Sequence, residues 1–258
     1  MAEDFIQTPF EAIAPFYDEL MKEIPYDMWV GYYLLLLISS GQQPRTMLEI
    51  GCGTGIITEL LHNEGFDVVG LDISAKMIDL AKAKAKRYRK KIKYVVADAT
   101  DFQLNQKFDA AYSFFDSLNN ILEPEDLTKC FQLVYEHLQP GGSFIFDLNT
   151  PYAFEHKMFD QKLLRKNASL RYQWEGDYDP ITKIVKVTME FWKDGRPFVE
   201  IHTQKAHLWH EVVDMLELCG FTKIKAYNSY SLDPPKKTSD RLHYVALKPE
   251  SIAIDGSL

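Results

Sequence analysis

Short apolar runs alternate with segments of helical periodicity along the first 150 residues. The runs TMLEI, DVVGLDI, KYVVADA, FDAAYSFF and SFIFDLN have the length and residue types of strands. Helical spacing lies between them, from Ile56 to Asn63, from Ser74 and from about Glu125. Strands that alternate with helices form βαβ units. We therefore expect a doubly wound, mostly parallel α/β sheet with both faces covered.

The segment before this unit is helical. Apolar spacing from Phe10 to Ser40 follows a helical period, broken at Pro15 and Pro25 and ended by GQQP. This pattern predicts a helical N-terminal cap.

The chain after Thr150 predicts an antiparallel insertion. SLRYQWEGDY, KIVKVTMEFW and PFVEIHTQKA have the pattern of three strands, and Asp194-Gly195 is a strong hairpin signal. HEVVDMLELCGF then returns to a helix, with Gly220 as its expected C-cap, and two strands follow. We divide the chain into a cap (1–44), a Rossmann-like domain (45–165 and 207–258) and an insertion (166–206). The large sheet is expected to have seven strands, the last of them antiparallel.

Composition narrows the class of protein. The formal net charge of −8 over 258 residues disfavours a nucleic-acid partner. Three cysteines without a C-x-x-C pair disfavour a disulfide framework and a zinc site, and they fit a reducing cytoplasm. The N-terminus lacks a signal-peptide pattern, and the apolar run from Met28 is too short to span a bilayer. We expect a cytoplasmic protein that does not enter a membrane.

The stretch LEIGCGTG from Leu48 is the strongest site signal. A glycine-rich turn between a strand and a helix brings backbone amides close to a ligand. No Gly-Lys-Ser/Thr is present, which excludes a P-loop, and Ile56 replaces the last glycine of a dinucleotide fingerprint, which disfavours NAD. Glu49 precedes the turn, and Asp72 and Asp98 end the next two strands. A carboxylate in the position of Asp72 can accept both hydroxyls of a ribose.

These motifs together resemble the class I S-adenosylmethionine-dependent methyltransferases, from Met47 to Thr150 closely and elsewhere loosely. LEIGCGTG resembles the first motif of that family, GLDIS the ribose-binding strand end and VVADATDF the adenine-binding segment. FDAAYSFFDSL resembles the fourth strand and LQPGGSFIFDL the turn into the fifth. The resemblance implies S-adenosylmethionine as methyl donor and S-adenosylhomocysteine as product.

The resemblance also assigns residues to parts of the donor. Glu49, Gly51, Gly53 and Gly55 would surround the methionine part, and Asp72 would hold the ribose. Ile73 and Met77 would border the adenine, Asp98 and the backbone of Ala99 would meet its amino group, and Phe114 would lie near the methionine part.

The N-terminal stretch AIAPFYDELMKEIPYDMWV is similar to the cap of small-molecule members such as the glycine and aminosugar N-methyltransferases. On that basis Tyr17 and Trp29 would contact the donor, with Tyr17 also a catalytic candidate. The alternative is that both belong to the apolar stripe of a docked helix.

Other polar and aromatic residues are candidates for the acceptor. Phe115, Asp116 and Asn119 follow the fourth strand, at the sheet edge where open α/β folds bind ligands. Asp116 is a catalytic candidate. Asn149 ends the fifth strand near Asp147, where a metal-binding role is less expected than a sheet-edge role, and we predict no metal.

Further candidates come from the insertion and the last strand. Tyr172 and Trp174 share a strand face, for stacking or for core packing. Arg241 would pair with an acceptor carboxylate or cap the sheet. His202 is the histidine candidate for proton transfer, while His207 and His210 match no metal motif.

The function expected from the sequence is methyl transfer to an O, N or S atom of a small molecule. The basic run KAKAKRYRKKIK from Lys82 keeps RNA or protein methylation as an alternative, although no RNA-binding module accompanies it. A module that binds the donor without catalysis is another. The oligomeric state, monomer or homodimer, stays open.

Overall fold

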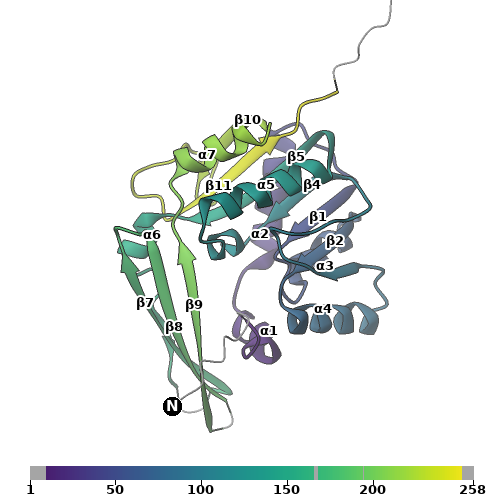
Figure 1. Cartoon of the computed structure of the whole chain (residues 1–258). Coiled ribbons are helices and arrows are strands. Elements are labelled where there is room, and N and C mark those ends of the chain that lie inside the picture. The colour runs from purple at the N-terminus through teal and green to yellow at the C-terminus, as the bar shows by residue number, and fades with distance from the viewer. Residues whose placement is uncertain (1–9, 166–167, 194, 252–258) are drawn as a thin grey trace, which may run out of the picture.

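The computed structural model describes residues 10–165, 168–193 and 195–251, which form two β-sheets with helices around the larger one (Figure 1). Asp194 of the expected hairpin turn lies outside the described residues, as do 1–9 of the expected cap, 166–167 of the insertion and 252–258 of the large domain.

The larger sheet has seven strands in the order β10-β11-β5-β4-β1-β2-β3. The pairs among β1 to β5 are parallel, and β11 is antiparallel to both of its neighbours, β5 and β10. The expected doubly wound sheet with an antiparallel last strand is therefore confirmed. Its strands are β1 (Thr46–Ile50), β2 (Asp67–Asp72), β3 (Lys93–Val96), β4 (Phe108–Ser113), β5 (Leu138–Asn149), β10 (Thr222–Asn228) and β11 (Arg241–Leu247).

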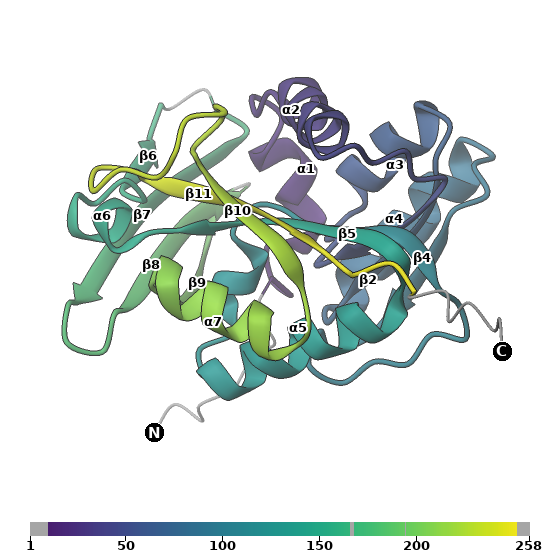
Figure 2. The same ribbon diagram turned by 90° about the horizontal axis from the view of Figure 1, so that it is seen from above.

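Helices cover both faces of this sheet (Figure 2). Successive side chains of a strand point to opposite faces. Met47 of β1 accordingly packs in the cluster with α2 and α3, and Leu48 in the cluster with α5 and α7. Both side chains are fully buried. The helices are α2 (Tyr26–Ser39), α3 (Ile56–Asn63), α4 (Ala75–Arg87), α5 (Pro124–His137) and α7 (Trp209–Leu218).

The N-terminal segment is helical, with breaks at the predicted prolines. A 3-10 turn, η1 (Ala14–Phe16), has Pro15 in its first turn and leads into the single turn α1 (Tyr17–Leu20). Pro25 is the N-cap of α2, because its ring fixes the backbone at a helix start. No helix in the described ranges is long and apolar enough to cross a membrane.

The smaller sheet is the predicted antiparallel insertion, with one more strand than expected. Its order is β6-β7-β8-β9, and the unpredicted β6 extends it to residue 161. One face of β8 is buried, with Val185, Val187, Met189 and Phe191 in a core shared with Ile13 of the N-terminal segment. The strands are β6 (Gln161–Leu163), β7 (Leu170–Asp179), β8 (Ile184–Lys193) and β9 (Arg196–Lys205). Two short helical elements, α6 (Pro151–Glu155) and η2 (Ser117–Asn120), were also not predicted.

The sequence QPGG does not form a separate turn before β5. It lies inside that strand, with Gly141 at φ +80°, and the pairing of β4 with β5 shifts between Phe108 and Ala110. A strand that continues through a bulge keeps its ladder hydrogen bonds on both sides. The Gly-rich signal therefore marks an irregular strand.

Candidate functional site

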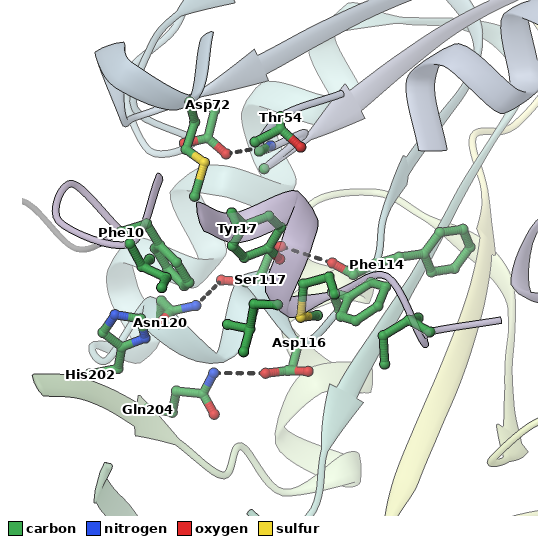
Figure 3. A pocket seen from close by; sticks show the side chains of 18 of the residues that line it. Phe10, Tyr17, Thr54, Asp72, Phe114, Asp116, Ser117, Asn120, His202 and Gln204 are labelled. Carbon is green, nitrogen blue, oxygen red and sulfur yellow. Dashed lines mark hydrogen bonds between the residues drawn. The ribbon is translucent and has the colours of Figure 1, made fainter. Parts of the chain in front are cut away.

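A cavity of about 1180 Å³ lies outside the carboxyl ends of β1, β2, β4 and β5. Open α/β sheets bind ligands at this edge. One part, the strand-end half, is lined by Gly51, Gly53, Asp72, Met77 and Asp98. The other part, the insertion half, is lined by Asp116, Asn149, Trp174, His202 and Gln204. Tyr17 of α1 lies between the two in Figure 3, with Asp72 on one side and Asp116 on the other.

The glycine turn follows β1 directly and leads into α3. Gly51 has φ +71°, and a Cβ built on it would approach the Ser117 side chain to 2.8 Å, so a side chain there would need both strain and displacement. Gly53 has φ +52° and nothing within 4 Å of a built Cβ. Its amide donates to Asp72 Oδ2 at 2.8 Å. The turn thus leaves open space beside a fixed carboxylate. Gly55 caps α3 and is not among the residues of the cavity wall.

Asp72 is held in place by the backbone. Its Oδ1 accepts from the amide of Ser74 at 2.8 Å, opposite the bond from Gly53 to Oδ2, and burial raises the pKa of the carboxyl. Each carboxylate oxygen has a second lone pair, so both can still accept from a ligand. The next residue, Ile73, leaves 51% of its surface exposed on the cavity wall, beside the buried Met77. A polar and an apolar ligand surface therefore adjoin.

Asp98 is the second strand-end carboxylate. Its Oδ1 accepts from the amide and the hydroxyl of Thr100, at 2.7 and 2.8 Å. Ala99 lines the cavity beside it. Because only Oδ1 is used in these bonds, Oδ2 has no partner among the described residues.

Glu49 is 3% exposed and reaches the cavity from the end of β1. Its Oε2 accepts from the hydroxyls of Thr58 and Tyr112, the latter at 2.9 Å. Burial raises the pKa of this carboxyl to about 7 and outweighs those two hydrogen bonds, which lower it. The side chain is therefore partly protonated near neutral pH.

The two cap residues both reach the cavity wall. Burial raises the pKa of Tyr17 well above its usual value, and the nearby Tyr26, Asp116 and Asp72 add to the effect. Trp29 packs against Phe115, with ring centroids 3.8 Å apart, and against Tyr230 at 5.4 Å. Trp29 thus joins an aromatic group at the rim, while Tyr17 is a phenol held protonated inside.

The loop after β4 contains two consecutive residues in the left-handed region, Phe115 at φ +62° and Asp116 at φ +48°. Phe114 precedes them and is buried, yet it lines the cavity. Left-handed backbone at non-glycine residues costs free energy and is common at functional sites. This conformation brings the Asp116 carboxylate to Gln204, whose Nε2 donates to Oδ2 at 2.8 Å.

Arg241 joins two carboxylates of the chain itself. It donates to Asp116 Oδ1 at 2.9 Å and to Oδ2 of Asp147, which is 1% exposed. Both of its charge partners are thus supplied within the protein, although Arg241 also lines the cavity.

The insertion contributes an apolar wall. Tyr172 and Trp174 line the cavity with ring centroids 5.3 Å apart, next to Val187 and Met189. Three buried polar atoms of this half have no partner in the described chain, namely Nε1 of Trp174, Nδ2 of Asn149 and Oε1 of Gln204. Such groups are costly unless a ligand or water satisfies them.

Asn119 has a structural position. Its Nδ2 donates to the carbonyls of Lys205 at 2.7 Å and of Asn149 at 3.2 Å, and its Oδ1 accepts from the Asn149 amide at 2.9 Å. It therefore ties η2 to β5 and β9, and it is not among the residues of the cavity wall.

The histidines lie in different settings. His202 is 6% exposed and lines the cavity. His207 is bonded to the Ile121 carbonyl at 2.8 Å, with its pKa lowered by burial, and His210 is exposed on α7. No group of three or more His, Cys, Asp or Glu residues in the described ranges is arranged to hold a metal ion.

The residues of this region that were not predicted include Tyr26, Glu200 and Gln204. Tyr26 packs on Phe115 in the rim group. Glu200 and Gln204 lie two residues on either side of His202, on the buried face of β9. A row of three polar residues at alternating positions on the inward face of a strand was a signal in the sequence, since such positions are usually apolar.

The strand-end half fits S-adenosylmethionine. Open space faces Gly53, where a Cβ would meet nothing within 4 Å, and Ile73 leaves an exposed apolar surface next to Met77. Asp72 and Asp98 have the acceptor oxygens that ribose hydroxyls and an adenine amino group require. The charged groups of this half are carboxylates, which suit a ligand with a sulfonium and an ammonium group.

Comparison with known proteins points the same way. A family model described as a methyltransferase domain matches residues 47–142. A protein assigned as a methyltransferase in Geobacillus sp. (strain WCH70) is 30% identical over 245 residues, 93% of this chain and 99% of that protein.

Two solved structures are similar over most of the chain. An S-adenosylmethionine-dependent methyltransferase from Clostridium acetobutylicum ATCC 824 has a TM-score of 0.81 and 25% identity, covering 94% of this chain and all of that one. The sugar N-methyltransferase KedS8 from Streptoalloteichus sp ATCC 53650 has a TM-score of 0.74 at 16% identity, covering 91% of this chain and 93% of that one. The second likeness shows the fold alone.

Proposed function

The chain belongs to the class I S-adenosylmethionine-dependent methyltransferases, and on that premise we propose that it methylates an O, N or S atom of a small-molecule acceptor. One observation carries the proposal: a single cavity of about 1180 Å³ joins the strand-end half to the insertion half. Pockets for one drug-sized ligand are commonly about 300–1,000 Å³. This cavity therefore has room for a methyl donor and a second small molecule.

S-adenosylmethionine supplies an electrophilic methyl group on a positively charged sulfur. In our proposal Glu49, Gly51, Gly53 and Phe114 adjoin its methionine part, and the assignment of Gly55, which lies outside the cavity wall, stays a prediction. Asp72 binds the ribose, while Ile73, Met77, Asp98 and Ala99 adjoin the adenine. The two bonds that fix the Asp72 carboxylate support its part in this assignment, because a fixed acceptor loses little freedom on binding.

The cap contributes by enclosing the site. Asp18, next to Tyr17, accepts from the Thr54 hydroxyl at 2.5 Å and from Lys84 at 2.8 Å. Glu19 accepts from Lys193 of β8 at 2.7 Å. The cap is thus bonded to both the Rossmann-like domain and the insertion. We propose that Tyr17 and Trp29 shield the methyl donor from water.

The insertion half would orient the acceptor. Phe115, Tyr172 and Trp174 present aromatic surface, while Asp116, Asn149 and Arg241 supply polar groups. Orientation of two reactants can contribute roughly 7–11 kcal/mol at best. The position of the cavity beneath the cap favours a small acceptor over a polymer. The Asn119 assignment stays a prediction for which the structure offers a structural alternative.

The test has two steps. Calorimetry with S-adenosylmethionine and S-adenosylhomocysteine measures donor binding. A methyl-release assay then compares three acceptors that each have a benzene ring with a two-carbon substituent but differ in nucleophile. They are 2-phenylethylamine, 4-ethylphenol and 2-phenylethanethiol, within a wider panel of amines, phenols and thiols. Turnover on one class supports the proposal. Binding without turnover on any acceptor would instead favour a non-catalytic donor-binding module, and turnover on RNA or protein alone would favour the polymer alternative.

The cellular location is a separate proposal. Cys52, Cys130 and Cys219 are free and buried. Free thiols are typical of reducing compartments, so we propose a cytoplasmic enzyme.

A further inference from the structure

Three polar side chains form a row on the inward face of β9. Glu200, His202 and Gln204 are all buried, whereas their partners on β8, Met189, Val187 and Val185, are apolar. Burying a carboxylate and an imidazole costs free energy unless their bonds are satisfied. An apolar row would stabilise this sheet more simply. The polar row therefore needs a reason beyond packing.

The first two members of the row form a close pair. Nε2 of His202 lies 2.8 Å from Oε2 of Glu200. The other oxygen, Oε1, accepts from the amide of Ile13 at 2.7 Å. A carboxylate has only acceptors, so the hydrogen of this bond must be on Nε2. The neutral imidazole then carries its lone pair on Nδ1.

The remaining nitrogen has no bond within the chain. No group in the described ranges bonds Nδ1, and His202 lines the cavity, where Figure 3 shows it beside Phe10. The ring of Phe10 packs on the imidazole, with centroids 4.2 Å apart, and fixes its plane. His202 is the one histidine of the described cavity wall. By contrast, His207 and His243 are kept neutral by burial, which lowers the pKa of His243 to about 3.

We infer that His202 is the catalytic base that removes the proton of the acceptor, and that Glu200 is the positioning residue that fixes its tautomer. This inference rests on the proposed methyltransferase function. A lone pair of the acceptor heteroatom forms the new bond to the methyl carbon. The electron pair of the carbon–sulfur bond goes to sulfur, which becomes a neutral thioether. The heteroatom's proton moves to Nδ1 of His202, and the positive charge on the imidazolium is stabilised by Glu200.

The surroundings of His202 agree with this role. The cavity wall that His202 shares carries several titratable or charged groups, among them Tyr17 of α1, Tyr172 of β7, Asp116 of the loop after β4 and Arg241 of β11, and Glu200 bonds His202 on its own strand. Tyr17 is held as a neutral phenol by burial and by nearby carboxylates, so it cannot serve as the base near neutral pH. Asp116 is already engaged by Arg241 and Gln204. Whereas both oxygens of Asp116 accept hydrogen bonds, Nδ1 of His202 accepts none from the described residues.

The pair also depends on the cap. Ile13 and Phe10 belong to the N-terminal segment, and they hold Glu200 and His202 from a sequence distance of 187 residues or more. The base is thus oriented only while the cap is docked against the insertion.

The kinetic test uses the full chain and whichever of 2-phenylethylamine, 4-ethylphenol and 2-phenylethanethiol the wild type methylates fastest. General-base catalysis contributes about 10²–10⁴-fold, so His202→Gln should lose at least a hundredfold in kcat. Its acid limb in the pH profile should also disappear. Glu200→Gln should also lower kcat and move the acid limb to lower pH, since the imidazolium loses its counter-charge. Added imidazole should restore part of the activity of His202→Ala. The control, His210→Gln, changes an exposed histidine on α7 and should match the wild type.

Two further measurements separate this role from a structural one and from failure of the proposed function. S-adenosylhomocysteine affinity should stay within about twofold in all variants, because Gly53 and Asp72 are untouched. NMR of ¹⁵N-histidine in the S-adenosylhomocysteine complex should show His202 as the Nε2–H tautomer in the wild type. A proton on Nδ1, or an unchanged pH profile in His202→Gln, overturns the inference while leaving the methyltransferase proposal intact. A wild type that binds donor but methylates nothing contradicts both.

Discussion

The hydrogen bonds within the two halves of the cavity join residues at very different separations along the chain. In the strand-end half, the bonds that fix Asp72 come from Ser74 and Gly53, which are 2 and 19 residues away. In the insertion half, Gln204 reaches Asp116 over 88 residues, and Arg241 reaches it over 125. The first half is made of backbone turns and the second of side chains. We therefore expect donor binding and acceptor-site integrity to respond to different substitutions.

Loss of Arg241 should have the largest effect, and only on the insertion half. Arg241→Met leaves the carboxylate of Asp147, which is 1% exposed, without its counter-charge. Breaking a buried pair from one side costs about 3–5 kcal/mol, measured here as the free energy of unfolding in urea. S-adenosylhomocysteine affinity of the folded protein should change by less than about twofold, since the halves share no bond at this point.

Two variants sharpen that result. Arg241→Met combined with Asp147→Asn should recover part of the lost stability, because the more deeply buried of the two stranded carboxylates no longer carries a charge. Arg45→Met removes an exposed pair at 3.8 Å and should cost below about 1 kcal/mol. Equal losses in Arg241→Met and Arg45→Met would contradict the importance of the buried cluster.

Glu49→Gln tests the buried carboxyl under the strand-end half. Folding raises the pKa of Glu49 from 4.5 to about 7, so the folded protein keeps a proton that the unfolded chain releases between these values. Wild-type stability should consequently fall as pH rises from about 4.5 to 7, by roughly 3 kcal/mol from this group. Glu49→Gln should lack that part of the decline.

The measurement is urea unfolding of both proteins at several pH values from 5 to 8. The difference in free energy of unfolding between variant and wild type should grow with pH and level off above 7. For Glu64→Gln, on the exposed turn after α3, the free energy of unfolding should differ from that of the wild type by the same amount at every pH. A constant difference for Glu49→Gln would show that its carboxyl titrates normally.

Asp72→Asn should weaken binding at the strand-end half without affecting the insertion half. Hydrogen bonds to a charged group contribute about 1.5–3 kcal/mol, so S-adenosylhomocysteine affinity should fall roughly tenfold to a hundredfold in calorimetry. Asp67→Asn, at the exposed start of the same strand, is the matched control and should bind as the wild type does. If both variants bind equally well, Asp72 does not hold the ribose.

The smallest and most specific effect should come from a comparison of Gly53→Ala with Gly41→Ala in stability and in ligand binding. Both glycines have positive φ, +52° and +73°, and neither has a neighbour within 4 Å of a built Cβ. Each change should cost about 1–2 kcal/mol in unfolding free energy from backbone strain. Only Gly53 faces the cavity, so only Gly53→Ala should also weaken S-adenosylhomocysteine binding. Equal binding by both would place the ligand elsewhere.

The fold was predictable to a large extent because its signals are local. The strand–helix alternation, the prolines that break the cap and the alternating face of β8 all follow from neighbouring residues. The exceptions are instructive. QPGG has turn composition, yet it lies in β5 because the pairing with β4 continues through it. β6 has only three residues, too few for a pattern, and exists because β7 offers an edge.

The candidate site divides in the same way. Glu49, Asp72 and Asp98 were recognisable because each stands at a fixed place beside a strand end. Asn119 stays a predicted ligand-binding residue, and the structure offers a structural alternative, since its Nδ2 donates to the carbonyls of Asn149 and Lys205 and its Oδ1 accepts from the Asn149 amide. Glu200 gave only a weak signal on its own, since its meaning depends on His202 and on the amide of Ile13.

The sequence by itself determined the doubly wound sheet and the family, and it predicts the place of the methyl donor, because periodicity and a strand–turn–helix motif act over about twenty residues. Only the tertiary structure decided which carboxylates pair with Arg241, that Gln204 reaches Asp116, and how the cap docks on β9. Those outcomes depend on bonds across 88 to 187 residues, and the packing of separate elements sets such distances.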